Sequence, residues 1–283
     1  MNYLGIEYSI KNVPVLDDKF IPFGVWMREY LKEATNPIAI AVEREDGLIS
    51  VRESAIRGPK FAEANLRYVE RLVKFTLWST GGFRVYLRGC DEIAEKLAAA
   101  YSPEGERAFD FGFFEDVYEK QLEVIACTEE TFPAANESAK AIGGHMEGCR
   151  IGFDAGGSDR KVSAVIDGES VYSEEVVWFP KITEDPEYHF NEIVTAFKTA
   201  ASKMPRVDAI GVSSAGTFVG NSPMVASLFI KVPRERRDEV KSIYDRAAKE
   251  IGDVPIVVAN DGDVTALAGY MSTGSGDILG IAM

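Results

Sequence analysis

The sequence has few cysteines, few histidines and a deficit of basic residues. Its 283 residues include three cysteines and two histidines, and 31 Lys and Arg residues stand against 45 acidic ones, which gives a net charge of -14. The cysteines are widely spaced and odd in number, so they indicate neither a disulfide framework nor a Cys-x-x-Cys metal site. The acidic balance argues against nucleic acid or an anionic membrane as the main partner.

Long apolar runs and a secretory signal are also missing. No stretch approaches the roughly 20 apolar residues that span a bilayer. The first 18 residues contain Glu7, Lys11 and Asp17 in place of a basic segment followed by an apolar one. Together with the scarcity of cysteine, these absences predict a cytoplasmic protein. The length and a hydrophobic share of 46% leave room for about two packed domains.

Composition changes near residue 148, after a loop-like stretch over 131–145 that is rich in small residues. We interpret residues 1–148 as an accessory α+β region. Its expected elements are a strand pair at 37–42 and 48–51 around an Asp-Gly turn, a helix over 61–78 and a strand over 83–87. The last two superficially suggest a winged helix. However, residues 52–96 carry nine Lys and Arg against six Asp and Glu, which is sparse for a base reader. We expect this region to pack on its neighbouring lobe or to mediate a homodimer.

The second half has a more regular pattern of strands and helices. Three strands joined by short Gly-containing turns come first, and buried strands separated by helices follow. This order predicts an α/β fold with a mixed sheet and helices on its faces. The expected strands are 150–154, 161–167, 171–179, 209–213 and 255–259, and the expected helices are 187–203, 234–251 and one that starts after 263.

The first chemical motif is a carboxylate followed by a Gly-Gly hairpin, Asp154-Ala155-Gly156-Gly157-Ser158. Glycine permits positive φ and lets a bulky anion approach backbone N–H groups. A carboxylate beside phosphates has its natural use in holding Mg²⁺ or the water molecules around it. The alternative is an ordinary hairpin turn with a solvated aspartate.

The second motif is an apolar strand that ends in Asn260-Asp261 immediately before a helix. Ligands of open α/β sheets bind at the carboxyl ends of strands. An aspartate there can accept the proton of a hydroxyl that attacks phosphorus. The alternative is helix capping, with Asn260 or Asp261 as the N-cap residue.

A third segment, Ser213-Ser214-Ala215-Gly216, ends another apolar strand. Its small side chains would let a ligand approach the backbone closely. The alternative is that these residues are small for packing reasons, and on its own the segment decides little.

The order and spacing of the three segments are more specific than any one of them. Over residues 150–283 they resemble the ROK family of sugar kinases and related repressors, within the actin, sugar-kinase and heat-shock-protein ATPase superfamily. The resemblance implies an actin-like ATPase fold of two ribonuclease-H-like lobes. Residues 149–272 would form the first lobe with its connecting helix, and 273–283 would give the first strand of a truncated second lobe.

The resemblance also implies roles for individual residues. Asp154, Gly156, Gly157 and Ser158 would bind the phosphates of ATP, with Asp154 holding Mg²⁺ through water. Asp261 would be the catalytic base, and Asn260, Ser214, Ala215 and Gly216 would contact a hexose or N-acetylhexosamine. The implied activity is ATP-dependent phosphorylation of a sugar hydroxyl, and the alternative is a sugar-sensing regulator or a non-catalytic sugar-binding protein.

The chain departs from the family pattern in several places. Ser158-Asp159 stands where Thr is usual, which adds a negative charge that Arg160 and Lys161 are expected to offset. Family segments for a second phosphate loop, for sugar binding and for zinc would lie beyond Met283, so we expect a truncated chain that is a poor catalyst. His145 and His189 do not replace those segments, and we interpret both as structural.

Overall fold

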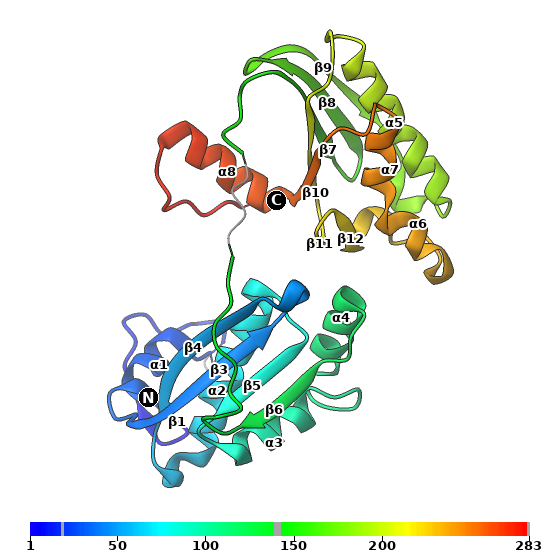
Figure 1. Ribbon diagram of the computed structural model, residues 1–283. Coiled ribbons are helices and arrows are strands. Elements are labelled where there is room, and N and C mark those ends of the chain that lie inside the picture. Colours follow the sequence, from blue (N-terminus) through cyan, green and yellow to red (C-terminus); the bar gives the residue numbers. More distant parts are fainter. Residues whose placement is uncertain (18–19, 139–142, 282–283) are drawn as a thin grey trace. The chain divides into compact units, whose positions relative to one another are not determined.

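The computed structural model describes residues 1–17, 20–138 and 143–281. The chain divides into two compact units, Met1–Ala139 and Lys140–Met283 (Figure 1). Part of the loop-like stretch over 131–145 therefore lies outside the described residues. No described helix combines the length and the apolarity that crossing a membrane requires.

The first unit is built on a four-stranded sheet. In the order β4-β3-β5-β6, its strands are Ile49–Ile56, Asn36–Glu43, Arg84–Arg88 and Glu123–Cys127. β3 is antiparallel to β4 and β5, whereas β5 is parallel to β6. The expected Asp-Gly turn joins β3 to β4, with Asp46 and Gly47 at positive φ. A small ladder pairs β1 (Asn2–Tyr3) with β2 (Ile6–Glu7).

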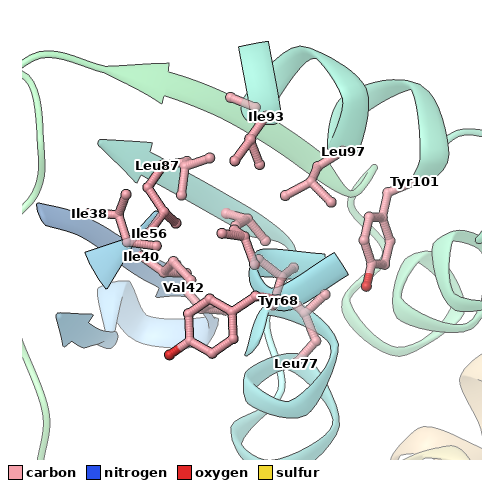
Figure 2. Packing of buried hydrophobic residues seen from close by; sticks show 14 of the residues in the cluster. Ile38, Ile40, Val42, Ile56, Tyr68, Leu77, Leu87, Ile93, Leu97 and Tyr101 are labelled. Atoms are coloured by element: carbon pink, nitrogen blue, oxygen red, sulfur yellow. The ribbon is translucent and has the colours of Figure 1, made fainter. Parts of the chain in front are cut away.

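Helices α1 (Phe23–Leu31), α2 (Ala62–Thr80), α3 (Asp91–Ala100) and α4 (Ala108–Tyr118) complete the first unit. Ile38, Ile40 and Val42 alternate along β3 and pack with Leu77 of α2 and Leu97 of α3 in one buried cluster (Figure 2). These three β3 side chains share one face of the strand, although every residue from Ile38 to Val42 is buried, and α2 buries one face at the helical period. The expected helix over 61–78 is α2.

The second unit has a five-stranded mixed sheet. In the order β13-β10-β7-β8-β9, its strands are Ile256–Asn260, Ala209–Ser214, Cys149–Ala155, Asp159–Ile166 and Glu169–Val177. β7, β8 and β9 form an antiparallel meander, and β10 and β13 add parallel to β7. Three hairpin strands followed by two parallel ones form a ribonuclease-H-like lobe, so the predicted fold class is confirmed.

Two helices supply the core of this lobe: α5 (Pro186–Ala201) and α7 (Ile243–Lys249). Phe197 and Tyr244 pack there with Ile151 and Phe153 of β7. The single helix expected over 234–251 is instead α6 (Arg237–Lys241) and α7, because Ser242 leaves helical geometry at φ -96° and ψ 5°. A short hairpin of β11 (Thr217–Val219) and β12 (Ser222–Val225) follows β10 and was not predicted.

Helix α8 (Asp261–Thr273) starts directly after β13 and ends at Gly274, whose φ is +71°. The strand expected at the end of the chain, over 277–283 within the segment 273–283, is not formed in the part that the structure describes. Residues 277–281 have no strand geometry, and 282–283 lie outside the described residues. Gly280 instead lies against α8, where a Cβ atom would collide with the carbonyl oxygen of Gly262. A strand needs a neighbour to accept and donate its backbone hydrogen bonds, and none lies beside these five residues.

Candidate functional site

The three motifs meet at one edge of the second unit's sheet. Asp154 on β7 is level with Ser213 on β10, and Ser213 is level with Ala259 on β13. Because the three strands are parallel, their carboxyl ends face the same way. Two strand spacings separate β7 from β13, which places the chain at Asp154 about 10 Å from the chain at Ala259. Asp261 follows two residues later.

Glycine in the hairpin between β7 and β8 is explained by steric crowding and not by backbone φ. Neither Gly156 nor Gly157 has a positive φ, contrary to the expected reason for glycine here. A Cβ atom on Gly156 would lie 2.5 Å from the carbonyl oxygen of Asp159. A Cβ atom on Gly157 would collide with the Nζ atom of Lys181. Gly156 therefore requires glycine on steric grounds, whereas at Gly157 the exposed Lys181 side chain could move aside.

Trp178 and Lys181 were missed by the sequence reading, although both contact this hairpin. The Trp178 ring is buried, and its Nε1 donates to the Gly156 carbonyl at 2.8 Å. Its backbone N–H donates to the Ser158 carbonyl at 3.2 Å. Lys181 is exposed and brings a positive charge to Gly157. The sequence signal for Lys181 would have been a cation close to a glycine hairpin. Lys181 is distant from Gly157 in the sequence, however, because β9 and the turn after it lie between them.

The charge added by Asp159 is offset by Lys161. The Nζ atom of Lys161 bonds Asp159 and lies 3.9 Å from the carboxylate of Asp154. The Lys161 ammonium, with a smaller contribution from the Ser158 hydroxyl, holds the pKa of Asp159 below its ordinary value. Arg160, the other cation expected to help, is buried and donates to Glu192 at 2.8 Å. Asp154 itself is about half exposed, at 45% of its side chain.

Asn260 links the second and third motifs. Its Oδ1 accepts from the backbone N–H of Gly262 at 2.8 Å, which caps α8. Its Nδ2 donates to the carbonyl of Gly216 at 2.9 Å. The capping role is therefore present, and the same side chain ties the start of α8 to the end of β10.

Asp261 is the first residue of α8 and is partly exposed. Its Oδ1 accepts from the Gly262 N–H at 3.0 Å. The described residues supply no hydrogen-bond donor to its Oδ2, which leaves one carboxylate oxygen available. The N-terminus of a helix is a position at which a negative charge is favourable.

The small-residue segment after β10 divides into buried and accessible parts. Ser214 is fully buried, and its Oγ accepts from the Tyr244 hydroxyl at 3.1 Å. Burial raises the pKa of Tyr244 to about 12. Ala215 and Gly216 are half-buried, and Gly216 has φ +143°. Ser214 therefore offers a ligand neither its side chain nor its backbone in this structure, unlike the sugar contact expected of it.

A hollow of about 630 Å³ lies over the sheet next to these strand ends. Asp154, Lys161 and Ser213 line it, with Gly152 and Gly211 further back along β7 and β10. The two glycines leave the sheet surface bare, which makes room above it. A volume of this size matches a small organic ligand.

The donor set of the site suits only a weakly held metal ion. Among the residues that the structure describes, no group of three or more His, Cys, Asp or Glu side chains is placed to bind a metal. A lone carboxylate such as Asp154 fits Mg²⁺, which keeps most of its waters and takes one or two protein carboxylates together with phosphates. His145 is exposed, whereas His189 is buried with both ring nitrogens near backbone carbonyls.

No protein-family model and no curated protein matches the sequence. Solved structures do match parts of it. A polyphosphate/ATP-glucomannokinase from Arthrobacter is 20% identical over 46% of this chain and 51% of that chain, with a TM-score of 0.36. A ROK hexokinase from Thermus thermophilus is 18% identical over 43% and 38%, with a TM-score of 0.32. A ROK family transcriptional regulator, a homologue of the Escherichia coli MLC protein, is 15% identical over 64% and 40%, with a TM-score of 0.34.

The chain is thus similar to ROK family kinases over about half of its length. It spans about a third to a half of the length of the first kinases it matches, from 35% to 51%. At these identities and TM-scores the likeness carries no argument about activity or substrate.

Proposed function

We propose that the second unit takes part in ATP-dependent transfer of a phosphoryl group to a hydroxyl of a hexose or N-acetylhexosamine. The observation that carries the proposal is the strand register, which brings Asp154 and Asp261 to the same sheet edge with the small-residue end of β10 between them. The backbone spacing of about 10 Å between β7 and β13 at this level leaves room for a phosphate and an attacking hydroxyl at the strand ends.

The hairpin side of the site is suited to polyphosphate. Backbone N–H groups around Gly156 and Gly157, with the Lys181 ammonium beside them, would hold phosphate oxygens. Asp154 would hold Mg²⁺ through water, and Mg-ATP when bound supplies the transferable phosphoryl group and neutralises its charge. Ser158 donates its hydroxyl to Asp159 at 2.9 Å, and the other carboxylate oxygen of Asp159 accepts from Lys161.

Asp261 is proposed as the catalytic base. Its open carboxylate oxygen would accept the proton of the sugar hydroxyl while the hydroxyl oxygen bonds the γ-phosphorus of ATP and the bond from that phosphorus to the leaving ADP breaks. Asn260 uses both polar atoms within the protein, so we assign it the role of fixing Gly216 and the start of α8. Ala215 and Gly216 would then offer backbone groups to the sugar.

Paired substitutions at the start of α8 test the base. Asp261→Asn should lower the turnover of ADP release, measured with a panel of hexoses and N-acetylhexosamines, by about 10²–10⁴-fold with little change in melting temperature. Asp263→Asn is the matched control. Asp263 is exposed in the same first turn of α8, and its substitution removes the same charge from the same helix end. Equal activity of the two variants would remove Asp261 from the role of base.

Nucleotide binding is tested separately from turnover. The chain has three tryptophans, so protein labelled with 5-fluorotryptophan should give three ¹⁹F signals. Mg-ATP should shift the Trp178 signal, because the Trp178 indole donates to Gly156 in the hairpin. An unmoved Trp178 signal at millimolar Mg-ATP would exclude the phosphate assignment. Sugar binding by calorimetry without ADP release would instead support the sugar-sensing or non-catalytic alternative.

We also propose that the reaction takes place in the cytoplasm. Cys90, Cys127 and Cys149 are all free thiols, which suits a reducing cytoplasm. Dimerisation through the first unit stays a prediction.

A further inference from the structure

The first unit carries a groove that the proposed kinase chemistry does not use. Residues of α1, α2 and the edge strand β4 line it, and its volume is about 640 Å³. That volume lies within the range of sites for small organic ligands. Phe23 of α1 and Phe75 and Trp78 of α2 form most of its apolar surface.

The groove is basic although the chain as a whole is acidic. Arg52, Arg71 and Lys74 line it, and no carboxylate does. Among the described residues, neither Arg52 nor Arg71 has a carboxylate within ion-pairing distance. Each lies over an aromatic ring instead: the Arg52 guanidinium is 5.5 Å from the centre of Phe75, and that of Arg71 is 5.6 Å from the centre of Phe23. Two guanidinium groups therefore stay available at the groove.

A buried carboxylate, that of Asp110, holds the Trp78 ring of the groove in place. Asp110 of α4 is 3% exposed and accepts from the Nε1 of Trp78 at 2.6 Å. It also lies 3.6 Å from the Nζ of Lys74, which partly neutralises that cation. The Trp78 ring stacks on Phe113 at 4.8 Å between centres. Trp78 is nevertheless 44% exposed and Phe75 is 59% exposed, so the groove presents two aromatic rings to solvent, of which Trp78 is held in place by Asp110 and Phe113.

We propose that this groove binds a small organic anion with a flat apolar body, such as an aromatic carboxylate, sulfonate or phosphate. The rings of Phe75 and Trp78 would cover the apolar body, and Arg52 and Arg71 would pair with the anionic group. The volume of about 640 Å³ and the three cations at the groove suit a small anionic molecule. Rigid aromatic rings lose little entropy on binding, which favours recognition by shape.

Two dyes that differ only in charge test the proposal on the whole chain. 8-Anilinonaphthalene-1-sulfonate carries a sulfonate, and N-phenyl-1-naphthylamine has the same rings without it. We expect the sulfonate to bind at least tenfold more tightly, with an affinity that falls about tenfold in each of Arg52→Gln and Arg71→Gln. Arg28→Gln is the matched control, because Arg28 is exposed on α1 but does not line the groove. It should change affinity by less than twofold.

The place of binding is read from the same ¹⁹F-labelled protein. The Trp78 signal should shift on adding the sulfonate, whereas that of Trp26, buried in the core of the first unit, should stay in place. Equal affinity for the neutral dye, unchanged affinity in both arginine variants, or a static Trp78 signal would each overturn the proposal. A dimer in sedimentation that the sulfonate dissociates would also overturn it, because a second copy would then be the natural occupant.

Discussion

Replacing His189 with phenylalanine should destabilise the second unit by about 2–4 kcal/mol. The imidazole is fully buried, with Nε2 3.0 Å from the Pro180 carbonyl and 3.1 Å from the Leu228 carbonyl. Its Nδ1 lies 3.1 Å from the carbonyl of Asp185. The ring therefore joins the turn after β9, the start of α5 and the segment after β12.

The size of the expected free-energy loss depends on which of the three carbonyls keep another hydrogen-bond donor once the imidazole is gone. The Asp185 carbonyl also accepts from Tyr188 N–H at 3.1 Å, and the Pro180 carbonyl accepts more weakly from Thr183 at 3.4 Å. Phenylalanine fills the same space between Trp178 and Phe229, so the cavity contribution is small. What remains is the cost of burying carbonyls whose hydrogen bonds are lost, about 1–3 kcal/mol each.

Urea unfolding followed through the ¹⁹F signal of Trp178 would measure this cost in the second unit alone. With a slope of about 2 kcal/mol per molar urea, in the middle of the usual range, the midpoint should fall by about 1–2 M. His145→Phe serves as the control, because His145 is exposed, and its midpoint should match that of the unmodified protein. A change of less than 0.5 kcal/mol in His189→Phe, of the order of an ordinary surface substitution, would refute the reasoning.

Two further outcomes follow from the site. Asn260→Ala should lower the melting temperature of the second unit through a loss of about 0.5–2 kcal/mol, because it removes the α8 cap and the tie to Gly216. Asn260→Asp keeps the cap but lacks the N–H donor to Gly216, so it should lose less; equal losses would contradict the cap, and no loss in Asn260→Asp would contradict the tie. Burial raises the pKa of Tyr244 to about 12, so the unfolded chain releases this proton near pH 10 and the folded chain does not. The free energy of unfolding should therefore fall between pH 10 and 12, and Tyr244→Phe should flatten that fall in alkaline denaturation curves.

Local patterns predicted most of the second unit. The alternation along β7, with Ile151 and Phe153 toward the helices and Gly152 and Asp154 away from them, is visible in the sequence and places Asp154 beside the hollow. The Gly-Gly hairpin and the strand-to-helix step at Asn260 are local signals as well. Their meeting at one edge follows once β7, β10 and β13 are parallel.

Contacts between distant segments could not be read in this way. The bond from Asn260 to Gly216 depends on the register of two strands whose pairing the sequence does not encode locally. The same holds for Trp178, which reaches back 22 residues to Gly156. Arg160 and Lys161 look equivalent in the sequence, but adjacent strand residues point to opposite faces, so only Lys161 meets Asp159.

Strand β9 of the second unit ends its sheet, with β8 on one side and no described strand on the other. It is nine residues long and exposes Val171 and Val177. An edge strand has unpaired backbone N–H and C=O groups, which can pair with the same edge strand of another molecule. Charged side chains on the strand oppose such pairing. Glu169, Glu174 and Glu175 supply like charges along β9 that repel a second copy near neutral pH. Salt screens repulsion between exposed charges, so concentrated stocks should be kept at low ionic strength.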